Sequence, residues 1–565
     1  MPLEKRWVVL EADEEKVKAL QQALGIHPVL CKLLVLRGIT DYESAKKFFR
    51  PSLEDLHDPF LMKDMDKAIA RIDQAIQNNE KIMIYGDYDV DGTTAVSLVY
   101  SFFCGIYGNI TYYIPDRYTE GYGISKQGID FAAENNFKLI IALDCGIKAH
   151  DKIDYANSKN VDFIICDHHL PGDTIPNAIA VLDPKRNDCN YPYKDLSGCG
   201  IGFKLIQAYA QKNNVPFEKV CSQLELVAIS IASDIVPITG ENRILAKFGL
   251  DKINTAPLPG IKALMNDIKL TKNMEISDLV FIIGPRINAA GRIAHGSEAV
   301  ELLIECDFDT AVSKTKKVQE NNVTRKTLDK DITEEAFAMI DNDIVQAKRK
   351  STVLYQPHWH KGVIGIVASR LIEKYYRPTI IIADSNGQAV GSGRSVPGFD
   401  LHEAIVACNE YLVQFGGHKY AAGLTIEIDN IPSFSEKFEQ IVQERITDDM
   451  LVPMEEIDAE LELNEITDKF YNILDQMAPF GPGNMKPVFV TRDVYDTGFS
   501  KVLKDNHLKL NILKDGQDPK NGVGFSMGDY MNIMNEKDVF DICYQLYANE
   551  WNGQRKIEFR LKDLR

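Results

Sequence analysis

The chain has 565 residues, of which 45% are hydrophobic and 26% are charged, as is ordinary for globular domains. This length is enough for about four domains, and the composition excludes a mainly disordered, collagen-like or coiled-coil protein. The net charge of −18 argues against a protein that coats DNA non-specifically, because such proteins present a basic surface. A local basic groove on an acidic body is still compatible with nucleic acid, so that hypothesis needs Arg and Lys at particular positions.

The sequence shows no sign of membrane insertion or export. No run of about 18 uncharged apolar residues occurs, so we expect no transmembrane helix, and the first residues lack the apolar core of a signal peptide. The ten cysteines are scattered and form no Cys-x-x-Cys pair, which disfavours zinc and makes a reducing cytoplasm the simplest location. The absence of a zipper or an internal repeat favours a monomer.

Changes in residue pattern divide the chain into five predicted parts. Residues 1–75 predict a helical lead-in. Residues 76–310 alternate short apolar runs with helix-sized segments, a pattern typical of buried parallel strands in an α/β sheet, and residues 311–348 predict a long connecting helix. Residues 349–452 predict a second, smaller α/β domain with glycine-rich turns. Short alternating β segments in residues 453–565 predict a small β-barrel.

Chemically reactive residues follow four predicted strands in the second part. The strands are expected at 81–85, 139–143, 161–166 and 178–182, and they are followed by Asp87-x-Asp89-x-Asp91-Gly92, Asp144, Asp167-His168-His169 and Asp183. In an open α/β sheet, ligands bind beyond the carboxyl ends of the strands. We therefore expect these carboxylates and imidazoles to face one crevice.

Such a group of acids indicates metal binding, because uncompensated carboxylates repel and raise each other's pKa. Mixed Asp and His ligands suit Mn²⁺ or Mg²⁺, and two such ions about 3.5–4 Å apart can clamp a phosphoryl group and activate water. Alternation along an extended segment predicts Asp87, Asp89 and Asp91 on one face, with a helix starting after Gly92. A calcium-binding loop is disfavoured, since its twelfth position should be Glu and is Leu98 here.

Two further motifs have a structural alternative. His168-His169 alone would be interpreted as structural histidines, but their place at a strand end beside other acids favours metal binding. Asp234, in Ser233-Asp234-Ile235 before Pro237, would alone be interpreted as a helix cap or a turn residue.

Together these motifs resemble the DHH phosphoesterase superfamily, and within it the exonucleases specific for single-stranded DNA, nearly from end to end. Further matching motifs are Gly284-Pro285-Arg286 through Arg292 and Gly416-Gly417-His418. The resemblance implies two Mn²⁺ or Mg²⁺ ions held by Asp89, Asp91, Asp144, His168, His169 and Asp234, with Asp144 bridging them. It implies that Asp144, His169 and His418 act at the reacting phosphate, and that Asp87 and Asp167 orient a ligand or a water. Tyr85 departs from the pattern, since relatives often carry a His ligand there.

Basic and small residues on glycine-flanked loops are candidates for phosphate contact. Each Arg alone is equally compatible with a surface salt bridge, although the guanidinium suits bidentate phosphate binding. By resemblance, a pocket for the 5′ end would contain Arg117, Arg286 or Arg292, Gln319, Ser392, Arg394 and Gly417. A pocket for a terminal phosphate would explain exonuclease activity and 5′→3′ polarity.

The resemblance predicts a metal-dependent 5′→3′ exonuclease that degrades single-stranded DNA to 5′-mononucleotides in recombination and mismatch repair. The C-terminal barrel resembles an OB-fold that would hold the strand, with Phe489, Lys501, Lys504 and Lys509 as candidate contacts. A RecQ-like helicase and single-strand-binding protein are the partners it implies. The alternatives are a DHH phosphodiesterase of short oligonucleotides or cyclic dinucleotides, which typically lacks residues 453–565, and a non-catalytic scaffold, which lacks metal ligands.

Overall fold

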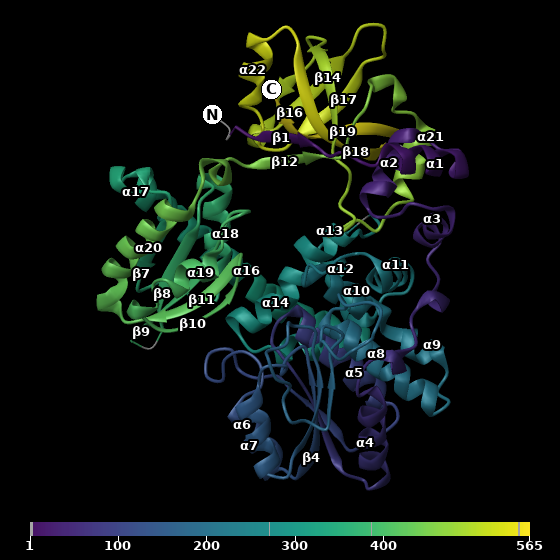
Figure 1. Cartoon of the computed structure of the whole chain (residues 1–565), viewed down its shortest axis with the longest axis vertical. Helices are drawn as coiled ribbons and strands as arrows, with labels where there is room; N and C mark the ends of the chain where they lie inside the picture. The colour runs from purple at the N-terminus through teal and green to yellow at the C-terminus, as the bar shows by residue number, and fades with distance from the viewer. Residues whose placement is uncertain (1–3, 271, 386, 552–553) are drawn as a thin grey trace. The chain divides into compact units, whose positions relative to one another are not determined.

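Figure 1 shows the computed structural model of the chain, which describes residues 4–270, 272–385, 387–551 and 554–565. The chain forms two compact units. The parallel-sheet unit consists of residues 42–323 and 475–486, and the mixed-sheet unit consists of the residues up to Asp41 with 324–474 and 487–565. The short segment 475–486, which we expected with the C-terminal barrel, therefore packs with the parallel sheet. No described helix is both long enough and apolar enough to cross a membrane.

A parallel β-sheet forms the centre of the first unit (Figure 1). In the described part of the chain its five strands run in the order β3-β2-β4-β5-β6, and every neighbouring pair is parallel. Strand β3 was not predicted, because it is a short, half-buried edge strand, although its Ile, Thr and Tyr residues favour β structure. The strands are β2 (Lys81–Gly86), β3 (Ile110–Tyr113), β4 (Phe137–Leu143), β5 (Asp162–Cys166) and β6 (Ala180–Leu182).

Helices cover both faces of this sheet, which explains the nearly continuous apolar strands. Ile84 and Ile141 pack in the core with α4, α5, α8 and α10, whereas Met83 and Tyr85 pack on the opposite face with α6 and α7. The helices are α3 (Tyr42–Phe49), α4 (Met65–Gln77), α5 (Val90–Cys104), α6 (Lys126–Glu134), α7 (His150–Ser158), α8 (Gly198–Lys212), α9 (Phe217–Val220), α10 (Leu224–Ser233), α11 (Gly240–Thr255), α12 (Pro259–Asp267), α13 (Ile276–Asp278), α14 (Gly284–Ile293) and α15 (Ser297–Leu303).

The predicted connecting helix is present as α16 (Phe308–Asp341), which continues from one unit into the other. The short helix α17 (Ile344–Lys348) follows it. The connection thus starts three residues before the predicted position and is interrupted after Asp341.

The mixed-sheet unit contains a five-stranded sheet in the order β10-β11-β9-β8-β7 within the described residues. Only β7 and β8 are parallel. Its elements are β7 (Thr352–Gln356), α18 (Ile364–Tyr375), β8 (Thr379–Ser385), β9 (Gln388–Arg394), α19 (Leu401–Val406), β10 (Leu412–His418), β11 (Ala421–Ile426) and α20 (Ile431–Arg445).

The C-terminal sheet closes on itself, because β14 pairs with both β18 and β16. This closure through β14, β18, β19, β17 and β16 gives the five-stranded barrel of an OB-fold. The elements are β12 (Met454–Ile457), β13 (Ala459–Glu460), α21 (Asp468–Asp475), β14 (Phe489–Asp496), β15 (Lys501–Val502), β16 (Leu508–Leu513), β17 (Lys520–Gly524), α22 (Tyr530–Glu536), β18 (Phe540–Trp551) and β19 (Gln554–Leu564).

We expected a helical N-terminal segment, but the segment is only partly helical. It begins with strand β1 (Arg6–Val9), which pairs in parallel with β12, and continues with α1 (Glu14–Leu24) and α2 (Pro28–Leu36). The indole Nε1 of Trp7 donates to Asp563 Oδ2 at 2.6 Å. Pairing partners more than 440 residues away cannot be found from local sequence, which explains the difference.

A buried polar network joins α8 to α11 in the parallel-sheet unit. Lys204 Nζ lies 2.6 Å from Glu241 Oε1, and both side chains are almost fully buried. The Tyr191 hydroxyl donates to Glu241 Oε2 at 2.6 Å, and the amide of His57 donates to Oε1 at 3.0 Å. Lys204 also donates to the carbonyl of His57 at 3.0 Å. The network therefore fixes α8 against the segment that precedes the sheet.

We predict that Lys204→Met lowers the free energy of unfolding by about 3–5 kcal/mol, because Glu241 is left as a buried charge without its cation. Lys212→Met on the same helix is the control, since Lys212 and Asp73 form a partly exposed pair of a kind worth about 0–1 kcal/mol. Urea unfolding followed by circular dichroism measures both changes. Equal midpoints for the two variants would contradict the assignment.

Candidate metal centre and phosphate-binding residues

The acidic motif after β2 is a turn followed by a helix, not the extended segment we predicted. Helix α5 starts at Val90, and the Asp89 side chain caps it by accepting from the Gly92 amide at 3.0 Å. Asp91 consequently lies in the first helical turn. A Cβ at Gly92 would lie 2.4 Å from the Asp87 carbonyl oxygen, so the close approach of the turn to the helix requires glycine.

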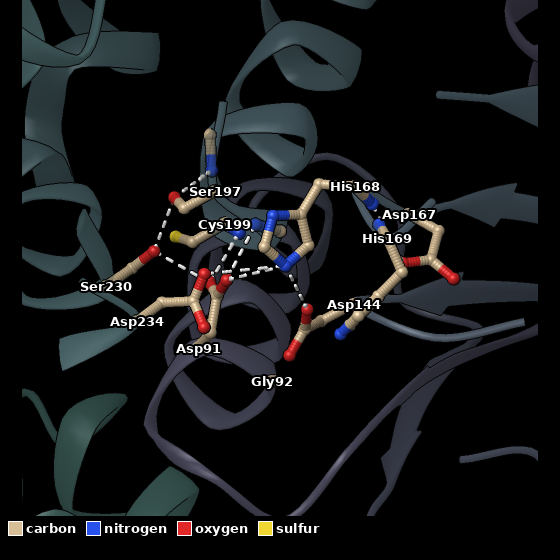
Figure 2. A network of polar contacts seen from close by, with 12 residues as sticks. Asp91, Gly92, Asp144, Asp167, His168, His169, Ser197, Cys199, Ser230 and Asp234 are labelled. Carbon is tan, nitrogen blue, oxygen red and sulfur yellow. Dashed lines mark hydrogen bonds and ion pairs between the residues drawn. The ribbon is translucent and has the colours of Figure 1, made fainter. Parts of the chain in front are cut away.

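Asp91 is held by the N-terminus of α8 (Figure 2). The amide of Gly198 donates to its Oδ2 at 2.7 Å, and the amide of Cys199 donates to its Oδ1 at 2.8 Å. Ser230 Oγ lies 2.7 Å from the same Oδ1 and 2.6 Å from Ser197 Oγ. Free amides at a helix N-terminus stabilise a carboxylate. The sequence analysis missed these supporting residues, although Ser197 before a Gly-Cys-Gly helix start is a recognisable cap.

Three carboxylates converge on one imidazole nitrogen at the carboxyl ends of the strands (Figure 2). His168 Nε2 lies 3.2 Å from Asp144 Oδ1, 3.5 Å from Asp234 Oδ2 and 3.7 Å from Asp91 Oδ2. Asp144 Oδ1 and both His168 ring nitrogens are buried without a hydrogen-bond partner among the described residues. Buried oxygen and nitrogen atoms that make no hydrogen bond are suited to bind a metal ion.

Two overlapping groups have the spacing of metal ligands. One consists of Asp91, His168 and Asp234, and the other of Asp144, His168 and His169, with the ligand atoms of each group within 4.8 Å of one another. The structure thus brings together five of the six predicted ligands. Asp89 belongs to neither group, so its role as a ligand stays a prediction.

The electrostatics of the cluster favour a cation. Burial, with the negative charges of Asp91 and Asp89, raises the pKa of Asp144 well above its ordinary value. The same causes raise the pKa of Asp234 to about 8, and burial with Asp91 raises that of Asp89. A divalent cation would remove this repulsion, and carboxylate with imidazole suits Mn²⁺ or Mg²⁺. The residues present therefore fit the predicted ions.

His169 is oriented by Asp167. Its Nδ1 lies 2.7 Å from Asp167 Oδ1, which also accepts from the amide of His168 at 2.8 Å, while the Ile147 amide donates to Oδ2 at 2.9 Å. Burial alone would raise the pKa of Asp167. The interactions with His169 and the Ile147 amide outweigh burial and lower this pKa to about 2. Since the carboxylate accepts, Nδ1 carries the proton and Nε2 is left to face the metal groups.

Asp87 and Tyr85 lie differently from the ligands. The Asp87 carboxyl is fully buried, and burial with the charge of Asp89 raises its pKa. Tyr85 points to the opposite face of β2, where its hydroxyl donates to the Gly123 carbonyl at 2.9 Å and accepts from the Ser125 amide at 3.1 Å. At this position the chain therefore uses tyrosine to fix a loop.

The backbone is left-handed next to two of the ligands. Asp144 itself has φ 60°, and Ile235, directly after Asp234, also has φ 60°. Ile235 is 64% exposed, so no buried contact accounts for the conformation of a β-branched residue. Such positions cost about 1–3 kcal/mol and concentrate at functional sites.

The predicted phosphate contacts of the parallel-sheet unit lie on helices more often than we expected. Arg286 and Arg292 are on α14 and not on a loop, and Gln319 is on α16. Buried Arg286 Nε and Gln319 Oε1 have no hydrogen-bond partner among the residues described. Arg117 does lie on a loop, with its guanidinium 4.9 Å from the centre of the Tyr88 ring.

The remaining phosphate candidates belong to the mixed-sheet unit and lie on strands, which corrects the prediction of loops. Ser392 and Arg394 are on β9, and Gly417 and His418 are on β10. Arg394 and His418 both pair with Ala421 of β11, so they share one row of the sheet. The Arg394 guanidinium donates to Ser392 Oγ at 3.2 Å. The joining of this set with Arg117 and Gln319 in one pocket stays a prediction.

The N-terminus of α18 lies beside the phosphate candidates of the mixed-sheet unit. A Cβ at Gly365, at the start of α18, would lie 2.9 Å from both Arg394 Nη2 and Ser392 Oγ. The glycine therefore lets the guanidinium and the hydroxyl approach the positive end of the helix, an arrangement that suits an anion. Gly365 was not predicted, although glycines at 362 and 365, on either side of a helix start, are a signal for such a site.

On the barrel, one candidate DNA contact is wrong and others are accessible. Phe489 is fully buried in the barrel core because its register turns it inward. Lys501 and Lys509 are exposed and directly opposite each other on β15 and β16, a like-charge pair that an anion would stabilise. Phe525, which was not predicted, is exposed and contacts His507 edge to face. The centre of its ring lies 5.1 Å from the Arg560 guanidinium.

Comparison with known proteins identifies three matching domains. The model of the DHH family, N-terminal domain, matches residues 81–231; the DHHA1 domain matches residues 349–444; and the RecJ OB domain matches residues 457–563. The prediction of an α/β protein with a DHH sheet, a second domain and an OB barrel is confirmed.

Relatives with 30% identity or more match nearly the whole chain. It is 35% identical to the single-stranded-DNA-specific exonuclease RecJ of Bacillus subtilis, over 99% of this chain and 70% of that protein. It is 31% identical to the enzyme of that name from Escherichia coli, over 95% of this chain and 96% of that protein. The crystal structure of RecJ from Thermus thermophilus in complex with Mn²⁺ superposes with a TM-score of 0.84 at 26% identity, covering 99% of this chain and 79% of that one. The crystal structure of the same enzyme with Mg²⁺ superposes with a TM-score of 0.79.

We predict that Asp144→Asn raises the melting temperature of the EDTA-treated protein at pH 8 by about 2–4 °C, the shift expected for about 1 kcal/mol in a large domain. The folded-state pKa of Asp144 lies above its unfolded value, so the stability this group contributes at low pH is lost as the pH rises, and Asn removes the charge. With MnCl₂ the order should reverse, because the ion stabilises only a protein that binds it. Thermal melts in both buffers measure this.

Asp151→Asn is the matched control, since Asp151 lies exposed on α7 beside Lys152. It should melt like the wild type in both buffers. An Asp144→Asn variant that is less stable in EDTA and keeps the full Mn²⁺ response would contradict the metal assignment.

Proposed function

The chain is a member of the RecJ family of single-stranded-DNA-specific exonucleases, and on this basis we propose that it degrades single-stranded DNA from the 5′ end to 5′-mononucleotides, with two Mn²⁺ or Mg²⁺ ions. The observation that carries the proposal is the convergence of Asp91, Asp144 and Asp234 on His168. This arrangement is suited to phosphodiester hydrolysis, because it binds cations at the edge of the sheet where ligands bind.

The ions would be held by Asp91, Asp144, His168, His169 and Asp234, and we retain Asp89 as a sixth ligand. When bound, such ions lower the pKa of a water and stabilise charge on phosphoryl oxygens. The chain itself fixes the geometry. The α8 amides hold Asp91 in one orientation, and the contact of Asp167 with His169 Nδ1 leaves Nε2 for an ion. We also propose that Asp87 supports these ligands from its buried position.

Selection of the 5′ end would rest on the anion-binding groups. Arg394, Ser392 and the start of α18 form one set, to which we add Gly417 and, at the reacting phosphate, His418. Arg117, Gln319 and one of Arg286 and Arg292 form the other. A terminal phosphate carries more negative charge than an internal one, so donors of this kind favour chain ends.

The barrel would hold the incoming single strand. Its exposed Lys501 and Lys509 can contact phosphates, and Phe525 can stack on a base, the two interactions that OB-folds combine. We place the activity in the cytoplasm in recombination and mismatch repair, carried out by a monomer with a RecQ-like helicase and single-strand-binding protein as partners; family membership supports this setting.

The proposal is tested with a long single-stranded DNA labelled at its 5′ or 3′ end in separate reactions with Mn²⁺, Mg²⁺ or EDTA. We expect immediate release of a labelled mononucleotide from the 5′-labelled strand, gradual shortening of the 3′-labelled strand, and no cleavage in EDTA. Asp144→Ala should lower the rate by at least about 1,000-fold, because it removes a ligand to the ions, while strand binding measured by fluorescence anisotropy is retained.

Two outcomes would contradict the proposal. An intact long strand together with rapid cleavage of a dinucleotide control would favour the alternative, a DHH phosphodiesterase of short oligonucleotides or cyclic dinucleotides. Normal turnover by Asp144→Ala would exclude the two-ion mechanism.

A further inference from the structure

The hydroxyl of Tyr122 lies beside the candidate metal centre and has no part in the mechanism above. It lies 3.4 Å from His169 Nε2, the ring nitrogen that Asp167 leaves available. An ion bound by Nε2 would also bind the oxygens of the phosphate under attack. The Tyr122 hydroxyl is therefore next to the position where those oxygens must lie.

The loop that carries Tyr122 is fixed on both sides. Gly121 and Gly123 have φ of 86° and 78°, a conformation that favours glycine, so the backbone turns sharply on each side of Tyr122. Behind the loop, the buried hydroxyl of Tyr85 donates to the Gly123 carbonyl at 2.9 Å and accepts from the Ser125 amide at 3.1 Å. The loop is thus anchored by the residue that departs from the superfamily pattern.

A second anchor holds the other end of the loop. Glu120 accepts from the Ser125 hydroxyl at 2.5 Å and from the Tyr113 hydroxyl at 3.0 Å, and its Oε1 accepts from the Asp116 amide at 2.8 Å. Buried contacts of Tyr85 and partly buried contacts of Glu120 thus hold the loop on both sides of Tyr122, and preorganised catalytic groups require such support.

The Tyr122 ring is not a core residue, so packing in a hydrophobic core does not explain why its loop is anchored. It is 56% exposed and touches its aromatic neighbours only edge-on, with centroids 6.1 Å from Tyr88 and 6.3 Å from His169. The Arg117 guanidinium lies 4.9 Å from the centre of the neighbouring Tyr88 ring. Tyr122 is thus an exposed residue on an anchored loop, close to the metal ligand His169 and to the phosphate-binding candidate Arg117. This position suits contact with the substrate.

We propose that Tyr122 is a catalytic residue whose hydroxyl donates a hydrogen bond to a non-bridging oxygen of the phosphate that is cut, and that Tyr85 is the residue that positions it; this inference rests on the proposed function. In the reaction a water oxygen forms a bond to phosphorus and releases a proton to the solvent, the bond from phosphorus to the 3′ oxygen of the terminal nucleotide breaks, and that 3′ oxygen takes up a proton from the solvent. Tyr122 keeps its own proton and stabilises charge on the phosphate.

The test compares wild type, Tyr122→Phe and Tyr85→Phe in the full chain with 5′-phosphorylated single-stranded DNA and saturating Mn²⁺. Loss of one donor to a developing negative charge costs about 100–1,000-fold in rate, so Tyr122→Phe should lower kcat by about that factor with an unchanged KM. Mn²⁺ affinity, measured by calorimetry without DNA, should equal that of the wild type. Tyr155→Phe is the control, because its hydroxyl donates to Asp130 between α6 and α7.

The double variant tests the link between the two tyrosines. Tyr85→Phe should lower kcat less than Tyr122→Phe does, and Tyr85→Phe/Tyr122→Phe should be no slower than Tyr122→Phe, because a positioning residue has no effect once the group it positions is gone. Losses that multiply in the double variant would overturn the positioning role of Tyr85.

The failure of this inference differs from the failure of the proposed function. If the wild type cleaves the strand and Tyr122→Phe matches its kcat, the catalytic role of Tyr122 is wrong and the exonuclease stands. If Tyr122→Phe weakens Mn²⁺ binding and recovers its rate at higher Mn²⁺, the hydroxyl acts through the ion and the inference is also overturned. A wild type that leaves the strand intact contradicts the proposed function itself.

Discussion

Mutual repulsion among buried carboxylates is the constraint on which the rest of this structure depends. Asp91, Asp144 and Asp234 point at one imidazole nitrogen, and burial together with their neighbours raises the pKa of Asp144 and Asp234. Without a counter-ion such a cluster opposes folding, because its charged form is costly to bury. The same repulsion favours the binding of divalent cations, so the destabilising effect of the carboxylates and their function have one cause.

The scaffold around the cluster is built to withstand that repulsion. Parallel strands place Asp144 and the Asp167-His168-His169 motif at one edge of the sheet, and the first turn of α8 supplies amides that hold Asp91. Helix α8 is in turn fixed by the buried Lys204–Glu241 pair. The loop of Tyr122 is anchored from the far face of β2 through Tyr85. Ligands and substrate-facing groups are thus held by residues that lie outside the site.

The residues that carry the chemistry could be predicted from the sequence because their types are unusual where strands end. Asp144 and Asp167-His168-His169 follow apolar runs directly, and their position alone indicates a shared edge. Ser230 and the α8 amides could not be predicted as the groups that hold Asp91, since segments distant in the sequence bring them together. Phe489 was misassigned because barrel closure decides which side of β14 faces inward. The helix start at Val90 was missed because the cap residue, Asp89, lies three residues before the glycine.

The most direct test of the account is a crystal structure of the full chain with Mn²⁺, with the ions located by anomalous scattering. We expect two peaks about 3.5–4 Å apart within the two overlapping groups, Asp91, His168 and Asp234 and Asp144, His168 and His169, with Asp144 between the peaks. Absence of density at both groups, with manganese bound only elsewhere on the chain, would show that the carboxylate cluster is not a metal centre.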